Sequence, residues 1–538
     1  MAPDFDGLII GTGHNALVLQ AYLCRAGLRI LAIDRADRPG GGLTTVQRPA
    51  GSGFLHNEHS FFHRAITAMP WFRDLELARH GVRYIEPAFN VAMLLPGGGT
   101  LEWWTDLDRT VESFARLSPR DAATLRRWTE EFRPIVERIL FPEAQSPPLE
   151  PVRRRELLSR SALGRKLLET AALSPLEFVE REFEHDAIRA GLLFFNGLRE
   201  VDLRLKGFGH SIPMLMANPH KAQMVAGGSA RLAEALVADI REHGGEIRVN
   251  CEPRSILTRG GRAVGVELHD GHRIEARSFV ASNLNPQQTF LDLIDADTAG
   301  SRLREQAEAF QWNVLAPLFA LTLNLHEPPR YAAAATRPEL NEAFMIIMGL
   351  ERRLQFSEIV VAHERGTMPP TVMWGTCPSQ FDPSQAPPGK HTAFMWEKLP
   401  YALGSDPNSW DTAKVAHGRE MLQLWSRHAP NLAEGAVMES FVQSPLDTER
   451  RFPNMRRGDL LIGSFAGGQI GYNRPFPGAG HYRTPISGLY LCGGSTHPGG
   501  NITGLCGYNA ASVLAADLGL PRWWTPPNLE EALSGLSA

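Results

Sequence analysis

The stretch Ile9-Ile10-Gly11-Thr12-Gly13-His14-Asn15-Ala16 places a glycine-rich turn between an apolar segment and an amphipathic one. We expect a strand over residues 6–10 and a helix over residues 16–26. Gly11 allows a tight turn, Gly13 lets the backbone approach a pyrophosphate, and Ala16 is small enough for close helix–strand packing. The helix N-terminus offers unpaired N–H groups and a positive dipole end to phosphate. The stretch therefore predicts a dinucleotide-binding fold.

An acidic residue follows the second predicted strand, residues 28–33. Asp34 comes about 20 residues after the glycines, where an acid binds the ribose hydroxyls in dinucleotide folds. A plain tight turn in a sheet protein is the alternative interpretation of the glycines alone. Because strand, turn, helix and acid occur in this order, the sequence favours nucleotide binding.

A second glycine cluster, Gly40-Gly41-Gly42, begins six residues after Asp34. Two interpretations of this cluster stay open on the motif alone. It is a flexible surface loop, or its backbone passes over a second part of a long cofactor, with Arg38 and Thr45 as polar contacts.

Length, charge and cysteine content exclude several classes of protein. A chain of 538 residues is long enough for two or three domains, and its net charge of −4 gives no reason to expect a nucleic-acid partner. The five cysteines are scattered and lack C-x-x-C spacing, so we expect reduced thiols and no metal site. The acidic start lacks the basic residues of a signal peptide, and no run of about 18 apolar residues occurs. We therefore expect a cytoplasmic protein.

The sequence resembles the FAD-dependent phytoene desaturase and amine oxidase superfamily. Within it, the sequence is similar to the branch of pyridine nucleotide-disulfide oxidoreductase domain-containing protein 2. The opening motif of that branch is matched here by Gly11, Gly13, His14, Asn15, Asp34, Gly40, Gly41 and Thr45. The family usually has glutamate at the ribose position, and Asp34 is one methylene shorter but can still accept both hydroxyls.

The resemblance implies FAD as a non-covalent cofactor and an α/β fold. A Rossmann-like FAD-binding domain of the amine-oxidase type is assembled from separate segments, and an α+β substrate domain is inserted between them. The implied FAD-binding segments are 1–63, 220–283 and 455–520. The implied substrate domain comprises 64–219, which is mainly helical, and 284–454, and residues 521–538 form a tail.

The glycine-rich motif between Gly488 and Gly504 follows a predicted strand that ends at Cys492. The resemblance places the helix that begins near Ile502 at the pyrimidine end of the flavin, where its dipole favours the reduced anion. Asn501 stands where the family commonly has glycine. In the middle segment, Pro253 matches the residue whose backbone pairs with adenine, but proline has no N–H to donate.

These observations give two sets of candidate residues. The loop of residues 53–63, which the resemblance places beside the isoalloxazine, contributes His59 and Glu58 as acid–base candidates, and His497 is the third. Pocket lining alone is the alternative for these three, and a metal site in the loop is disfavoured because no paired carboxylates support it. The candidate FAD-binding residues are Gly11, Gly13, His14, Asn15, Ala16, Asp34, Arg35, Gly40, Gly41, Gly42, Thr45, Pro253, Ser282, Gly493, Gly494, Gly500, Asn501 and Ile502.

The first functional hypothesis is an FAD-dependent dehydrogenase or desaturase that takes a hydride from an apolar, isoprenoid or other lipid-like, small-molecule substrate to flavin N5. The alternatives are an oxidase that acts on an amine or other small molecule with oxygen, a flavin-dependent isomerase or saturase, and a non-catalytic binder like the Rab GDP-dissociation inhibitors. The basic, leucine-rich segment 153–168 predicts a solvated helix over a core, with peripheral membrane contact as the alternative. The sequence does not decide whether the chain forms an oligomer. The tail with Trp523 and Trp524 docks on the body or contacts a neighbouring protomer.

Overall fold

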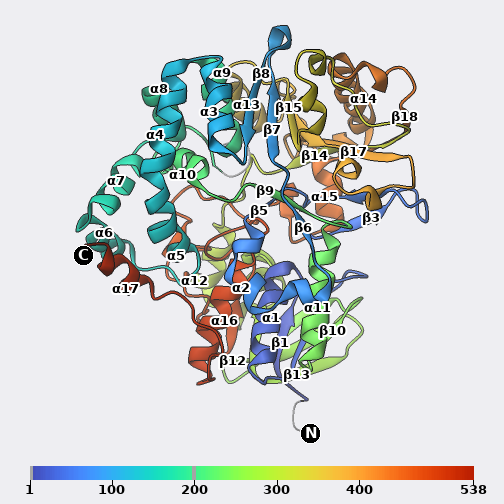
Figure 1. The fold of residues 1–538 in the computed structure, drawn as a ribbon. Helices are drawn as coiled ribbons and strands as arrows, with labels where there is room; N and C mark the ends of the chain where they lie inside the picture. Colours follow the sequence, from blue (N-terminus) through green and yellow to red (C-terminus); the bar gives the residue numbers. More distant parts are fainter. Residues whose placement is uncertain (1–3, 197–200, 538) are drawn as a thin grey trace.

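The computed structural model describes residues 4–196 and 201–537, so the first three residues of the acidic start lie outside the described part. The fold is α/β, as predicted. Two large mixed sheets with helices packed around them form a lower and an upper half in Figure 1. The domain boundaries given above stay predictions.

The lower sheet is built from three distant parts of the chain. Its inner strands pair in parallel and are apolar and buried, which is typical of a sheet covered on both faces. The antiparallel β11–β12 hairpin extends one edge. The strand order is β10 (Glu246–Arg248), β2 (Ile30–Ile33), β1 (Phe5–Ile10), β13 (Arg273–Ser282), β12 (Arg262–Leu268) and β11 (Pro253–Arg259), and β19 (Leu489–Leu491) also pairs with β13.

Helix α1 (His14–Arg25) packs on this sheet and is flanked by two further helices, α11 (Ala230–Glu242) and α16 (Leu505–Asp517) (Figure 1). Every residue from Asn15 to Cys24 is buried, because α11 and α16 cover the faces that the sheet leaves open. Helix α16 starts three residues later than the expected start near Ile502.

The upper sheet is also buried on both faces. Along β14 (Leu318–Leu325), Leu318 and Ala320 belong to one apolar core, whereas Phe319 and Leu321 belong to another, as the two-residue period of a strand requires. Helix α14 (Trp410–His428) packs on β14 and β18. The strand order is β18 (Val437–Gln443), β14, β17 (His391–Lys398), β16 (Met373–Thr376), β15 (Met345–Met348), β7 (Phe89–Leu94) and β8 (Thr100–Trp104).

A group of helices covers the β8 end of this sheet, and these helices follow local sequence signals. In α4 (Pro119–Ile135) the Ser118 side chain accepts a hydrogen bond from the Asp121 N–H, as an N-cap does. Pro134 lacks a donor, and the α-helix ends one residue after it in a π-helical turn, Val136–Leu140. Helices α3 (Leu107–Ala115), α8 (Pro175–Glu182) and α9 (Asp186–Asn196) complete this group.

The basic segment forms two helices, α6 (Pro151–Ser159) and α7 (Ala162–Ala171). Leu157, Leu158 and Leu167 are fully buried in the core. Several of its arginines pair with carboxylates, for example Arg154 with Glu143. The segment is therefore a pair of solvated helices over a core, and membrane contact stays a prediction. Within residues 4–196 and 201–537, no helix is both long enough and apolar enough to span a bilayer.

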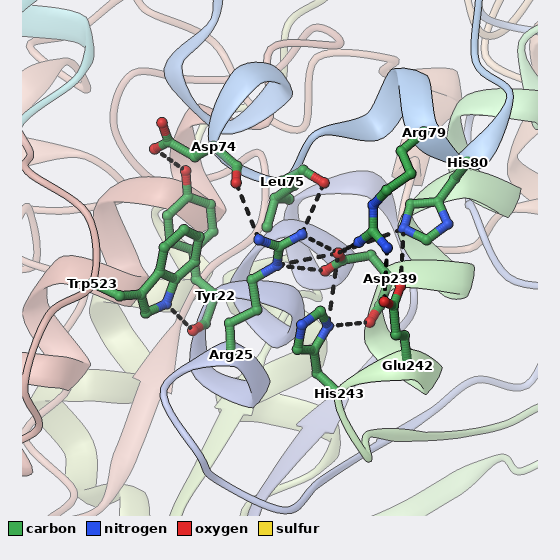
Figure 2. Close-up of polar contacts among 10 residues, drawn as sticks. All are labelled: Tyr22, Arg25, Asp74, Leu75, Arg79, His80, Asp239, Glu242, His243 and Trp523. Carbon is green, nitrogen blue, oxygen red and sulfur yellow. Dashed lines mark hydrogen bonds and ion pairs between the residues drawn. The ribbon is translucent and has the colours of Figure 1, made fainter.

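A buried ion-pair cluster holds α1, α11 and the segment of residues 66–80 together (Figure 2). The guanidinium of Arg25 donates to the carboxylate of Asp239 at 2.5 Å and to the backbone carbonyls of Asp74 and Leu75. The side chain of Asp239 is fully buried and that of Arg25 is 12% exposed. The tail docks beside this cluster, since Trp523 stacks on Tyr22 and its indole N–H donates to the Tyr22 carbonyl.

We expect Asp239→Ala to lower the free energy of unfolding by about 3–5 kcal/mol, because it leaves the Arg25 charge buried without its partner. Urea denaturation followed by circular dichroism measures this change. Glu242→Ala, which removes an exposed partner of Arg79, is the matched control and should leave the stability nearly unchanged. Equal effects of the two substitutions would contradict the assignment of Asp239 as the centre of the cluster.

Candidate active site

A cavity of about 1060 Å³ lies where the two halves meet, and both halves contribute to its wall. On the lower side it begins at the carboxyl edge of the sheet. Ile10, Ile33 and Ser282 stand side by side at the ends of β1, β2 and β13. The loops that leave these strands carry Gly11, Asp34 and Asn283, which all line the cavity. In parallel sheets, this edge is where nucleotides bind.

The two glycine clusters pack against each other at this edge. The Gly40 N–H donates to the Thr12 carbonyl at 2.9 Å, and a Cβ on Gly41 would lie 3.1 Å from the Gly13 Cα. Gly40 and Gly41 have φ values of +119° and +57°, which favour glycine. The second cluster is therefore a packed wall of the cavity and not a free surface loop.

Asp34 ties the first turn to the second strand. One carboxylate oxygen accepts hydrogen bonds from the N–H and the hydroxyl of Thr12, at 2.7 and 2.6 Å. The other accepts from the Ala36 N–H at 2.9 Å. The oxygen that accepts from Ala36 keeps one lone-pair site, and Asp34 lines the cavity, so it can both order the turn and accept a hydroxyl donor.

The C-terminal glycine loop closes the cavity from another side. Nε2 of His14 on α1 lies 3.0 Å from the Asn501 carbonyl oxygen. This contact joins the first and last motifs of the chain. Asn501 has a φ of +98°, a value that non-glycine residues rarely adopt. The loop is anchored by Arg474, whose fully buried guanidinium donates to backbone carbonyls that include those of Gly494 and Thr496.

Most of the predicted cofactor residues come together in this one cavity. The N-cap residue of α1 is Gly13, which has no side chain to cap the helix. The first N–H groups of the helix therefore lie open to the cavity. The predicted residues that line the cavity are Gly11, Gly13, His14, Asn15, Asp34, Arg35, Gly41, Gly42, Pro253, Gly494, Gly500, Asn501 and Ile502.

Five predicted residues lie behind the wall: Ala16, Gly40, Thr45, Ser282 and Gly493. Thr45 bonds Asn57 and accepts from the Ala230 N–H at the start of α11, so its contribution is to loop packing. Ser282 bonds Thr289. A Cβ on Gly493 would lie 2.4 Å from the Asn283 carbonyl oxygen, and one on Gly40 would lie 2.8 Å from the Ala233 Cβ. These positions shape the wall and do not face the cavity.

The three predicted catalytic residues have different surroundings. His59 and His497 line the cavity, whereas Glu58 does not. The Glu58 carboxylate forms ion pairs with Arg48 and Arg451, both at 2.7 Å. Glu58 is adjacent to His59 in the sequence, but its carboxylate is bound by these two arginines and it does not line the cavity.

Five histidines of the cavity wall have a pKa that burial lowers. The pKa falls to about 3 for His59 and His63 and to about 4 for His14, His210 and His497. These five rings are therefore neutral at pH 7, which suits an apolar cavity because charged rings would lose hydration there.

The sequence reasoning missed one polar group in this wall. Ser60 Oγ lies 2.5 Å from His63 Nε2, and His63 Nδ1 lies 2.9 Å from Tyr84 Oη. Ser60 and His63 line the cavity. The three-residue spacing of Ser60 and His63 is visible in the sequence, but nothing in the sequence pairs them with Tyr84.

The histidine-rich loop does not assemble into a metal site among the described residues. His56 bonds Asn324, His59 bonds Gln443 and His63 bonds Ser60. Within residues 4–196 and 201–537, a close group of three possible metal ligands occurs at His80, Asp239 and Glu242. Arg25 and Arg79 lie against the same carboxylates, and their positive charges disfavour a cation there.

Comparison with known proteins decides the family. Residues 19–505 match the model of the flavin containing amine oxidoreductases. The chain belongs to this family.

Curated relatives in this family cover nearly the whole chain. A limonene dehydrogenase chain of Castellaniella defragrans is 32% identical over 97% of this chain and 96% of its own. Pyridine nucleotide-disulfide oxidoreductase domain-containing protein 2 of Mus musculus is 25% identical over 96% of this chain and 94% of its own. The lycopene-forming phytoene desaturase of a Paracoccus strain is 24% identical over 95% of this chain and 97% of its own. The predicted superfamily and branch are confirmed.

The solved structure of cyclohexylamine oxidase from Brevibacterium oxydans has the same fold. It superposes with a TM-score of 0.60 at 15% identity and covers 96% of this chain and 100% of its own. The chain is thus an FAD-dependent oxidoreductase of the amine oxidoreductase family, with FAD as its cofactor.

The cavity fits FAD on its own evidence. The open N–H groups of α1 suit a pyrophosphate, and the glycines beside them leave no Cβ in its way. Asn283 Oδ1 is buried in the wall and has no hydrogen-bond partner among the described residues, so it is available to a ligand. When bound, FAD supplies a two-electron acceptor. The chain's residues orient it and exclude water.

We expect Gly13→Ala to weaken FAD binding about tenfold or more, because the new Cβ would lie 2.7 Å from Asn283 Nδ2 in the wall that receives the phosphates. Fluorescence titration of the apoprotein with FAD measures the affinity. Gly99→Ala is the control, since a Cβ there makes only ordinary contacts with Leu95. An unchanged affinity in Gly13→Ala would contradict the proposed cofactor position.

We expect the protein to lose stability as the pH falls from about 6.5 to about 4. In this range a histidine is protonated in the unfolded chain, but His210 stays neutral in the folded one because burial lowers its pKa to about 4. The free energy of unfolding therefore decreases with falling pH, and His210 contributes about 2 kcal/mol of the loss at pH 5.

Urea denaturation at pH 7 and pH 5 tests this expectation. His210→Gln should reduce the difference between the two pH values. His272→Gln is the control, because its side chain is 79% exposed and stays solvated in both states. A pH dependence that is the same in His210→Gln and the wild type would contradict the neutral, buried histidine.

Proposed function

We propose that this protein is an FAD-dependent dehydrogenase that removes hydrogen from a C–H bond of an apolar, isoprenoid-type hydrocarbon. The observation that carries the proposal is the composition of the upper half of the cavity. Aromatic and aliphatic side chains dominate it, among them Phe61, Phe62, Met214, Trp374 and Trp396. Such a surface binds a hydrocarbon by excluding water from it.

Charge disfavours an amine substrate. Four of the five carboxylates in the wall belong to the nucleotide side: Asp34, Asp37, Glu252 and Asp292. The fifth, Glu143, forms an ion pair with Arg154 at 2.5 Å. Arg451, which reaches the upper half, is itself paired with Glu58. A protonated amine would therefore find no unpaired carboxylate in the described wall of this half.

Two relatives support the same substrate class. One is named for its action on limonene, and the other is named a lycopene-forming phytoene desaturase. In this proposal the first turn of α1 holds the FAD pyrophosphate, Asp34 holds the ribose, and the 59–63 loop faces the isoalloxazine ring. FAD held there would accept the hydride that leaves the substrate carbon. Contact with a membrane surface and self-association stay predictions.

The test is anaerobic mixing of the FAD-loaded protein with limonene, phytoene, cyclohexylamine or putrescine, followed at the flavin absorbance. We expect limonene or phytoene to bleach the flavin and the two amines to leave it oxidised. Bleaching by an amine alone would support the oxidase alternative. Rearrangement of the hydrocarbon without bleaching would support the isomerase alternative, and either result would refute the dehydrogenase.

A further inference from the structure

A hydrogen-bonded chain of three side chains leads from the cavity into the protein. Ser60 Oγ and His63 Nε2 are 2.5 Å apart, and His63 Nδ1 and Tyr84 Oη are 2.9 Å apart. Ser60 and His63 are buried and line the cavity, whereas Tyr84 is half-buried and lies behind them. This hydrogen-bonded series of side chains thus has one end at the cavity and one end away from it.

A small three-stranded sheet holds this geometry. β5 (His63–Arg64) and β6 (Tyr84–Ile85) pair with opposite edges of β9 (Ala222–Val225). His63 stands opposite Gln223, and Tyr84 stands opposite Val225. Because Gln223 and Val225 are two residues apart, the side chains of His63 and Tyr84 lie on the same face of the sheet.

The hydrogen bonds can be arranged to accept a proton from the cavity. In the tautomer with its proton on Nδ1, His63 donates to Tyr84 Oη, and Nε2 accepts from the Ser60 hydroxyl. Ser60 lines the cavity, and the lone pairs of its Oγ are then free of the hydrogen bonds in this arrangement. Burial lowers the pKa of His63 to about 3, so the ring is neutral at pH 7 and Nε2 is unprotonated in this tautomer.

Three other histidines of the wall are held differently. His497 Nε2 is 2.8 Å from the Glu143 carbonyl, and His14 Nε2 is 3.0 Å from the Asn501 carbonyl, so each ring points a donor at a fixed acceptor. His59 Nε2 accepts from the Gln443 amide. Among the described residues of the wall, Ser60 and His63 combine a cavity-facing oxygen with a second base behind it.

We propose that Ser60 accepts the proton in a desaturation at this site, with His63 as the base that takes over the Ser60 proton and Tyr84 as the positioning residue that orients His63. This inference rests on the proposed function. As a substrate C–H bond breaks and its hydrogen leaves with both electrons to the bound FAD, the neighbouring carbon loses a proton to Ser60 Oγ. The Ser60 proton moves to His63 Nε2, and the electron pair of the second C–H bond becomes the new C=C bond.

The reaction makes modest demands on the base. A carbon beside a developing positive charge is strongly acidic, so a neutral hydroxyl–imidazole pair is sufficient to remove its proton. The arrangement of an oxygen, an imidazole and a third group that orients the imidazole is the general pattern of an activated hydroxyl. Here the hydroxyl receives a proton from carbon and forms no covalent bond with the substrate.

Rapid mixing of the FAD-loaded protein with limonene tests the proposal. We expect Ser60→Ala to slow flavin reduction about 10²–10⁴-fold, the usual contribution of a general base, with limonene binding changed less than about threefold. Ser60→Thr keeps the hydroxyl and should recover most of the rate. Ser379→Ala is the matched control, because Ser379 is buried and bonds His391 outside this cavity.

Two results would overturn the proposal. One is a Ser60→Ala rate within about threefold of the wild type, since a general base contributes far more. The other is independent of any substrate: the ¹⁵N resonances of His63, assigned with His63→Gln, should shift in Ser60→Ala and stay in place in Ser379→Ala. Unchanged His63 resonances in Ser60→Ala would refute the relay. A wild type that limonene and phytoene both fail to reduce would refute the proposed function instead.

Discussion

The backbone contact between the two glycine turns governs the geometry of this molecule. Gly13 and Gly41 approach so closely that a single Cβ on Gly41 would crowd the Gly13 Cα at 3.1 Å. That contact brings the loops after β1 and β2 together at the carboxyl edge of the lower sheet and leaves the first turn of α1 open to the cavity. Asp34 fixes the same corner through Thr12. The predicted FAD site is built on these contacts.

The upper half of the cavity is mainly apolar, and most histidines of the wall are neutral. Five of them have pKa values lowered by burial, and the carboxylate of Glu143 is paired with an arginine. These side chains therefore add no unbalanced charge to the space where a substrate would meet the flavin. Proton transfer in such a space depends on hydrogen-bonded chains like that of Ser60, His63 and Tyr84.

The sequence predicted the features that depend on local pattern. The strand, turn and helix from β1 to α1 and most of the wall-lining glycines lie where their motifs place them. Features set by distant contacts were not predictable. The full burial of α1 depends on α11 and α16, the turning away of Glu58 depends on Arg48 and Arg451, and the pairing of His63 with Tyr84 depends on β9.

The most direct test of the account is a crystal structure of the protein with FAD bound. The account predicts the pyrophosphate at the first turn of α1 beside Gly13, the ribose hydroxyls at Asp34, and the isoalloxazine ring between the 59–63 loop and the start of α16, with Ser60 facing the open side of the ring. An isoalloxazine ring placed outside the cavity, or turned so that the 59–63 loop does not face it, would contradict both the site and the chemistry assigned to it.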